Sequence, residues 1–202
     1  MSNNQPVDKE RRVWMIACGA AGGVAAVATG GAFLSTLAPS ERAKAAGAPV
    51  ELDIAGMKPG EMKTVEWRGK PVWVIRRDNK MIEDLKSNDT KLADPKSERK
   101  PGELTPEYAR NEYRSIKPEY LVAVGICSHL GCSPSAKFDA GPQPSLPDDW
   151  KGGFLCPCHG STFDLAGRVF ANKPAPDNLE VPPHKYLSDT KILIGVDDNH
   201  TA

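Results

Sequence analysis

The sequence predicts a mainly β protein, an antiparallel β-sandwich with a partly helical insertion, preceded by one N-terminal membrane-spanning helix. A long uncharged run lies near the N-terminus, and several short apolar runs broken by glycine and proline follow it. Short strands separated by turn residues are typical of antiparallel sheets. The 202 residues suffice for one good core, and the 26 basic and 26 acidic residues cancel, so the composition does not point to nucleic acid.

Residues 1–12 are polar, whereas residues 13–37 carry no charge. As a helix the uncharged run would measure about 37 Å, enough to cross a hydrocarbon core of ~30 Å. Basic residues before it predict a cytoplasmic N-terminus and a large domain outside the cytoplasm. The pair Arg11 and Arg12 resembles a twin-arginine export signal, a route that carries folded proteins. A cleavable secretory signal is the alternative, but the apolar run is longer than such signals usually have.

Within the helix, Gly19 and Gly23 have the small-xxx-small spacing that favours packing against partner helices. Residues 38–49 are small and mixed in character, without an apolar stripe, and predict a linker that serves as a tether or a hinge. The globular domain then occupies residues 50–202. Its insertion, residues 78–118, is charged, and Thr105 with Pro106 predicts a helix over Glu107–Arg114.

Eight strands are expected in this domain from alternating or continuous apolar runs. They are Val50–Ile54, Met62–Trp67, Val72–Ile75, Tyr120–Ile126, Gly153–Leu155, Arg168–Phe170, Tyr186–Leu187 and Lys191–Val196.

Two short loops carry the chemistry. They read Cys127-Ser-His129-Leu-Gly-Cys132 and Cys156-Pro-Cys158-His159-Gly-Ser161, with 23 residues between them. Thiolate together with imidazole suits zinc or an iron–sulfur cluster. A 2Fe-2S cluster can take two cysteines on one iron and two histidines on the other. The second loop crowds three potential ligands, Cys156, Cys158 and His159, into four residues and so leaves one in excess for a zinc site, which favours the cluster; zinc stays the alternative.

The two loops resemble those of the Rieske iron–sulfur proteins of the quinol:cytochrome c reductases, the cytochrome bc complexes. The likeness continues through residues 161–164, 166–169 and 173–182. It implies a Rieske-type β-sandwich whose cluster-binding part covers about residues 120–180, with one 2Fe-2S cluster. The implied metal ligands are Cys127, His129, Cys156 and His159, and the implied disulfide joins Cys132 to Cys158. Such a bond persists in an oxidising compartment, which agrees with a domain exported across a bacterial inner membrane.

The resemblance also assigns roles. An imidazole on iron keeps a second nitrogen, so His129 and His159 can link proton uptake to electron uptake, and His159 is the expected hydrogen-bond partner of quinol. Ser161 matches a hydroxyl donor to a bridging sulfide. Leu130 is expected to dock on a partner or to shield the cluster.

Further residues are expected to shape the loop that covers the cluster and to set the cluster's reduction potential. Pro174 and Pro176 match a proline loop that excludes water. Asp177 stands where relatives often have an apolar residue. Phe163 stands where many relatives have a tyrosine that bonds a ligand sulfur, which predicts a lower reduction potential for this chain.

The resemblance implies that the protein belongs to a membrane complex that contributes to proton translocation. It also implies that this complex is a dimer. Quinol binds beside a cytochrome b subunit, which takes its second electron, and the first electron passes to a membrane-bound c-type cytochrome. Alternatives are the Rieske subunit of an exported oxidoreductase such as arsenite oxidase, a Rieske ferredoxin serving an oxygenase, and a zinc-stabilised module without redox function. His184 and His200 lack a partnered cysteine and are expected at the surface. Trp67, Trp73 and Trp150 are expected in the core.

Overall fold

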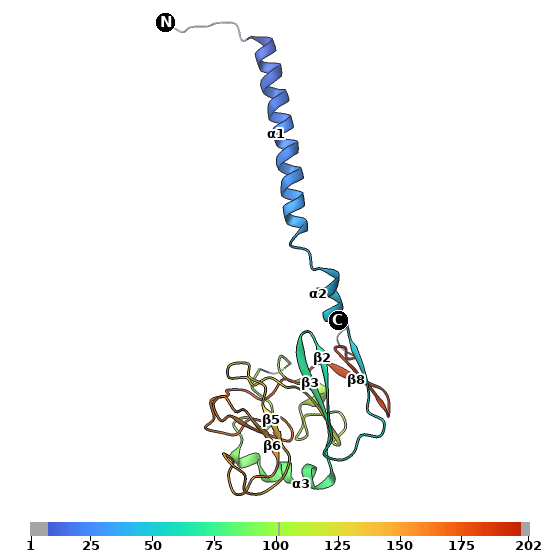
Figure 1. Cartoon of the computed structure of the whole chain (residues 1–202), viewed down its shortest axis with the longest axis vertical. Helices are drawn as coiled ribbons and strands as arrows, with labels where there is room; N and C mark the ends of the chain where they lie inside the picture. Colours follow the sequence, from blue (N-terminus) through green and yellow to red (C-terminus); the bar gives the residue numbers. More distant parts are fainter. Residues whose placement is uncertain (1–7, 101, 199–202) are drawn as a thin grey trace. The chain divides into compact units, whose positions relative to one another are not determined.

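The computed structural model describes residues 8–100 and 102–198, and the chain divides into two compact units between Lys44 and Ala45 (Figure 1). In the N-terminal unit, α1 (Lys9–Ser35) is one continuous helix, and the side chain of Asp8 accepts a hydrogen bond from Glu10 N–H at its start. By its length and composition the helix could cross a membrane. The predicted N-terminal apolar helix is therefore present. A short helix, α2 (Glu41–Ala46), lies within the segment predicted as a linker.

The described residues of the second unit form three antiparallel sheets of three strands each, which confirms the mainly β prediction. The first sheet has the order β1 (Val50–Asp53), β9 (Lys191–Ile194), β8 (His184–Ser188). The second has the order β2 (Met62–Trp67), β3 (Lys70–Arg76), β4 (Tyr120–Val124). The third has the order β5 (Ser135–Lys137), β6 (Gly153–Leu155), β7 (Thr162–Asp164).

The central strand of the second sheet, β3, is buried on both faces, which explains the continuous apolar run at residues 72–75. Because side chains alternate along a strand, Val72 and Val74 of β3 face one way and Trp73 and Ile75 the other. The valines share a core with side chains of the first sheet, including Ile192. Trp73 and Ile75 share a second core with residues of the cluster loops and of the third sheet. This second core connects the sandwich to the part of the unit that carries both loops.

The insertion is helical at a different place from the one predicted. The structure has α3 (Asn79–Ser87), capped by Asp78, and the two 3-10 turns η1 (Asp89–Lys91) and η2 (Glu107–Ala109). The predicted helix over Glu107–Arg114 is wrong, because it ends at Ala109. Arg114 is fully buried with a φ of 48°, outside the helical region, and its guanidinium bonds backbone carbonyls elsewhere in the unit. Those contacts override the local preference for a helix.

Two other predictions need correction. Residues Arg168–Phe170 make isolated bridges, Val169 to Phe163 and Phe170 to Leu92, and form no named strand. His184 is 1% exposed, so its expected place on the surface is wrong. It begins β8, and its Nδ1 lies 2.8 Å from Pro182 O.

His200 lies outside the described residues. The three tryptophans of the domain are buried as predicted: Trp67, Trp73 and Trp150.

Candidate metal centre

The two cysteine–histidine loops are built in the same way. The first follows β4, and the second joins β6 to β7. In the first loop, Cys127 N–H donates to Cys132 O and Gly131 N–H donates to Cys127 O. In the second, Cys156 N–H donates to Ser161 O and Gly160 N–H donates to Cys156 O. Each loop is therefore closed on itself by a pair of backbone hydrogen bonds that span the same number of residues.

A glycine sits at the same place in both loops, and the backbone conformation requires it. Gly131 has a φ of 81° and Gly160 a φ of 73°. A Cβ atom added at either residue would meet nothing within 4 Å, so space is not the reason. The left-handed conformation favours glycine because it has no side chain to clash with its own backbone.

The four predicted ligands come together, with the cysteines inside and the histidines outside. Cys127 and Cys156 are each 2% exposed and share one core with Trp73, Phe154 and other buried residues. His129 is half-buried and His159 is exposed. Their rings lie with centroids 4.8 Å apart and nearly perpendicular, at 85°. Two buried sulfurs next to two outward imidazoles match the division of ligands between the two irons of a Rieske cluster.

The predicted disulfide is present between Cys132 and Cys158, and it ties the two loops together. The sulfurs of Cys132, Cys156 and Cys158 all lie within 4.8 Å of one another. Because two of these three sulfurs are bonded to each other, only Cys156 of this group offers a thiolate to a metal. The disulfide thus leaves Cys127 and Cys156 as free cysteines, and these are the two that the sequence assigned to the cluster.

Polar groups aim at the sulfur of Cys127. Burial raises the pKa of the Cys127 thiol, and the neighbouring Cys156 raises it further. The backbone N–H of His129 and the hydroxyl of Ser161 donate hydrogen bonds to the Cys127 sulfur, which opposes this rise. The Ser161 Oγ also accepts a hydrogen bond of 3.0 Å from Ala175 N–H, which leaves its own proton free for the sulfur. Donors placed around a buried thiolate are what a cluster ligand needs. The donor set therefore fits a 2Fe-2S group.

The predicted proline loop lies against both cluster loops. Pro174 and Pro176 are exposed, whereas Ala175 between them is 3% exposed and belongs to the same core as Cys127 and Cys156. Leu130 is 70% exposed, so it projects from the first loop as an apolar side chain. Ala175 is thus buried beside the ligand cysteines, while the shielding role expected of Pro174 and Pro176 and the docking role expected of Leu130 stay predictions.

Behind the loops, an aromatic stack supports the second one. The ring of Trp73 from β3 stacks on that of Phe154 from β6 with centroids 5.0 Å apart, and Phe138 meets Phe154 edge-on. Gly125, just before the first loop, makes room for this stack, because a Cβ atom there would lie 2.2 Å from the Trp73 ring. Sequence reasoning assigned Trp73 to the core and did not single out Gly125.

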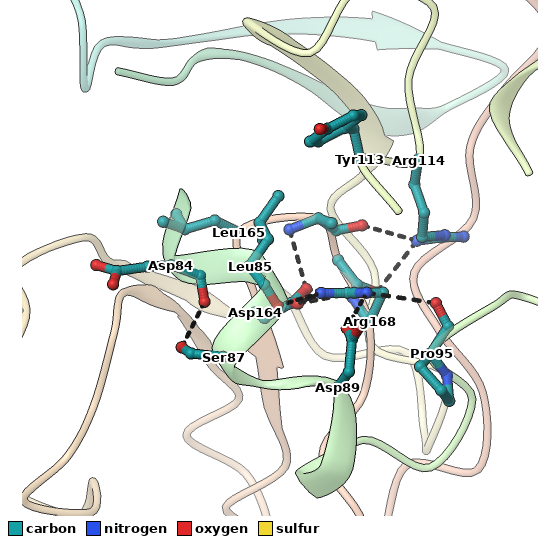
Figure 2. Close-up of polar contacts among 12 residues, drawn as sticks. Asp84, Leu85, Ser87, Asp89, Pro95, Tyr113, Arg114, Asp164, Leu165 and Arg168 are labelled. Atoms are coloured by element: carbon teal, nitrogen blue, oxygen red, sulfur yellow. Dashed lines mark hydrogen bonds and ion pairs between the residues drawn. The ribbon is translucent and has the colours of Figure 1, made fainter. Parts of the chain in front are cut away.

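A buried arginine network, which sequence reasoning missed, holds the turn after β7. Arg168 pairs with the buried Asp164 at 2.8 Å and with Asp89 at 2.8 Å, and it donates to Leu85 O and Pro95 O (Figure 2). Arg114 and Arg77 donate to backbone carbonyls between residues 165 and 167, among others. Burial lowers the pKa of each of these two arginines to about 10. The network fixes the strand that follows Ser161.

The comparisons with known proteins agree with this geometry. A family model described as the Rieske [2Fe-2S] domain matches residues 49–183. The chain belongs to the Rieske family. The ubiquinol-cytochrome c reductase iron-sulfur subunit of Allochromatium vinosum is 57% identical to this Rieske protein over 196 residues, which are 96% of this chain and 92% of the relative. The subunit of the same name from Bradyrhizobium diazoefficiens is 38% identical over 184 residues, covering 89% and 90% of the two chains.

Among solved structures, a chain of a hyperthermophilic respiratory Complex III is 27% identical to this Rieske protein. The match covers 88% of this Rieske protein and 98% of the Complex III chain. Its TM-score is 0.47, too low to decide function. The family membership, together with the near full-length match to the bacterial subunits, confirms the resemblance stated from the two loops and the 2Fe-2S cofactor that it implied.

Proposed function

We propose that this Rieske protein is the electron-transfer subunit of a membrane quinol:cytochrome c oxidoreductase. The observation that carries the proposal is the arrangement of its two loops, with buried Cys127 and Cys156 beside outward-facing His129 and His159. The relatives that match nearly the whole chain are named as iron–sulfur subunits of such a reductase, which supports it. In this assignment Cys127 and Cys156 bind one iron, and His129 and His159 bind the other.

When bound, the cluster supplies a one-electron acceptor with a potential that Rieske proteins tune between roughly −150 and +300 mV. The protein supplies the rest. The core around Cys127 and Cys156 excludes water from the sulfurs, and Ser161 with His129 N–H donates hydrogen bonds to the sulfur of Cys127. Such donors stabilise added negative charge and so favour the reduced state.

The histidines meet the substrate. A quinol must lose a proton along with each electron, and His159 is exposed, so the ring nitrogen that does not bind iron can accept a hydrogen bond and then a proton from a quinol hydroxyl. His129 lies beside it and is half-buried. The exposed Leu130 offers an apolar contact to the surface that brings quinol to this histidine.

The proposed complex supplies the remaining steps. Quinol oxidation releases two electrons. One passes through this subunit to a membrane-bound c-type cytochrome, and the other passes to a cytochrome b subunit. We place the complex in a bacterial inner membrane as a dimer, with α1 as the anchor, its N-terminus in the cytoplasm and the globular unit in the periplasm. The length and apolar composition of α1 and the basic Arg11 and Arg12 at its N-terminal end support this orientation. Export along the twin-arginine route would let the cluster enter a folded domain.

The experiment uses membranes that contain the full-length chain with its complex. The proposal expects the rhombic low-temperature EPR signal of a histidine-ligated 2Fe-2S cluster after reduction with ascorbate. It also expects the line shape to change when a quinol-site inhibitor is added. Cys156→Ser should abolish the signal, whereas the matched control Cys18→Ser, a free cysteine in α1, should keep it.

The other outcomes identify the alternatives. A cluster signal that ignores every quinol-site inhibitor would replace the proposal with another kind of Rieske electron carrier, such as a subunit of an exported oxidoreductase. Zinc in metal analysis with no EPR signal would leave a zinc-stabilised module without redox function.

A further inference from the structure

The proline loop donates both of its available N–H groups to the two cluster loops. Pro174 and Pro176 have no N–H, so Ala175 and Asp177 are the donors in this stretch. Ala175 N–H donates to Ser161 Oγ of the second loop at 3.0 Å. Asp177 N–H donates to Ser128 Oγ of the first loop at 3.2 Å, and the Ser128 hydroxyl donates to Asp177 O at 2.6 Å. The cover is thus joined to each loop through a serine that adjoins or faces a cysteine ligand.

The insertion holds the same cover from the other side. Lys100 forms an ion pair of 2.9 Å with the carboxylate of Asp177, and Arg99 donates to Pro176 O at 2.6 Å. The side chain of Asn178 donates to Asp94 O and to Ser97 Oγ. Residues 94–100 therefore clasp residues 176–178 through four polar contacts.

The clasp has a defined backbone. The carboxylate of Asp94 accepts hydrogen bonds from Glu98 N–H and Arg99 N–H, which closes the segment into a turn. Ser97 and Lys100 both have positive φ, 55° and 49°, a conformation that is unfavourable for a residue other than glycine. The turn thus directs the amine of Lys100 to a fixed partner.

The charge of Asp177 gives this contact a consequence for electron transfer. The carboxyl side chain is 12% exposed, and its backbone is bonded to Ser128, which lies between the proposed ligands Cys127 and His129. A negative charge there opposes the arrival of an electron at the loops. The ammonium of Lys100 cancels that charge, and hydrogen bonding to Asp177 raises the pKa of Lys100, which keeps it protonated.

We propose that Lys100 is a positioning residue of the cluster site, which acts through Asp177. It fixes the proline loop onto both cluster loops and neutralises the carboxylate that this chain places beside the first of them. The effect on electron transfer rests on the proposed function and its ligand set. The clasp, meaning the contacts between residues 94–100 and residues 176–178, does not depend on that function.

The test compares full-length Lys100→Met, Asp177→Leu and the double variant in the assembled complex, with redox titration followed by EPR. Lys100→Met leaves the carboxylate uncompensated and should lower the midpoint potential. Asp177→Leu leaves the ammonium uncompensated and should raise it, and the double variant should return close to the parent. Because Lys100 is half exposed, both single shifts should shrink as salt is added. Lys100→Arg keeps the charge and should leave the potential near the parent value.

Amide hydrogen exchange gives a readout that does not depend on the cluster. Exchange at Ala175 and Asp177 should speed up by roughly tenfold in Lys100→Met, the factor expected for the loss of one hydrogen-bonded contact. Lys80→Met is the matched control, because it removes a lysine–aspartate pair of similar length, 2.8 Å, on α3, and it should change neither exchange nor potential.

The outcomes separate the inference from the proposed function. The role of Lys100 would be overturned if Lys100→Met and Asp177→Leu shifted the midpoint potential in the same direction. It would also be overturned if amide hydrogen exchange at Ala175 and Asp177 were equally fast in Lys100→Met and in the parent. Absence of the Rieske EPR signal from the parent complex would overturn the proposed function, and the exchange data would still decide whether the clasp exists.

Discussion

Arg168 and Asp164 form an ion pair of 2.8 Å in which the side chains are 1% and 0% exposed. Asp164 also accepts hydrogen bonds from Ala166 N–H and Arg168 N–H, so its two oxygens organise the whole turn after β7. The same turn receives the guanidinium groups of Arg77 and Arg114. The buried carboxylate of Asp164 thus compensates the positive charge of the arginines that gather at the end of β7, the strand that follows Ser161.

We therefore expect Asp164→Asn to destabilise the domain by about 3–5 kcal/mol, because removing one partner leaves a buried charge uncompensated. Denaturant unfolding of the full-length chain in detergent would measure the loss. Asp189→Asn is the control, since Asp189 is 96% exposed in its pair with Lys117, and it should leave the unfolding free energy close to that of the parent. Equal losses in the two variants would contradict the role of the buried pair.

Gly125→Ala should destabilise the domain by about 1–3 kcal/mol, because the new methyl group overlaps the Trp73 ring and forces the stack with Phe154 to shift. The measurement is denaturant unfolding, in the parent and in a Trp73→Phe background. The smaller ring should relieve the overlap, so the cost of Gly125→Ala should fall in that background. An equal cost in both backgrounds would show that Trp73 is not what excludes a side chain at residue 125.

The sequence predicted the site better than the insertion, and the reason is physical. The ligand loops are local, since the type and spacing of Cys127, His129, Cys156 and His159 identify the chemistry. The run at residues 72–75 is likewise local, because a strand buried on both faces must be apolar throughout. These features need no knowledge of what lies elsewhere in the fold.

The missed features depend on partners far along the chain. Arg114 reads as the last residue of a helix until its carbonyl partners at residues 166, 167 and 179 are known. Asp177 reads as an unusual loop residue until Lys100 is placed beside it. His184 reads as a surface histidine because no cysteine partners it in the sequence, whereas its bond to Pro182 O lets a neutral ring be buried.

The buried His184 predicts acid sensitivity. Burial lowers its pKa below the ordinary 6.5, and its Nε2 has no hydrogen-bond partner among the described residues. The unfolded chain therefore binds more protons than the folded one as the pH falls below about 6.5, and stability should decrease in that range. His184→Asn keeps a donor for Pro182 O and removes the titration. It should lower stability at neutral pH through lost packing but flatten its dependence on pH.

Unfolding free energies of both proteins between pH 7.5 and 5, about the range in which a histidine titrates, would measure the difference. Parallel pH profiles for the parent and His184→Asn would rule out this histidine as the acid-sensitive group.

Phe163→Tyr should raise the midpoint potential of the cluster. Phe163 is fully buried in the same core as Cys127 and Cys156, so a phenol hydroxyl at this residue would enter the environment of the ligand sulfurs. An added hydrogen bond to sulfur stabilises the reduced state, and a net contribution of about 0.5–1.5 kcal/mol corresponds to roughly 20–60 mV for one electron. Redox titration followed by EPR would measure the shift. Phe138→Tyr adds the same hydroxyl to a ring that meets Phe154 edge-on, and it should leave the potential unchanged. A midpoint for Phe163→Tyr equal to or below the parent's would sink the idea that the missing hydroxyl lowers the potential of this chain.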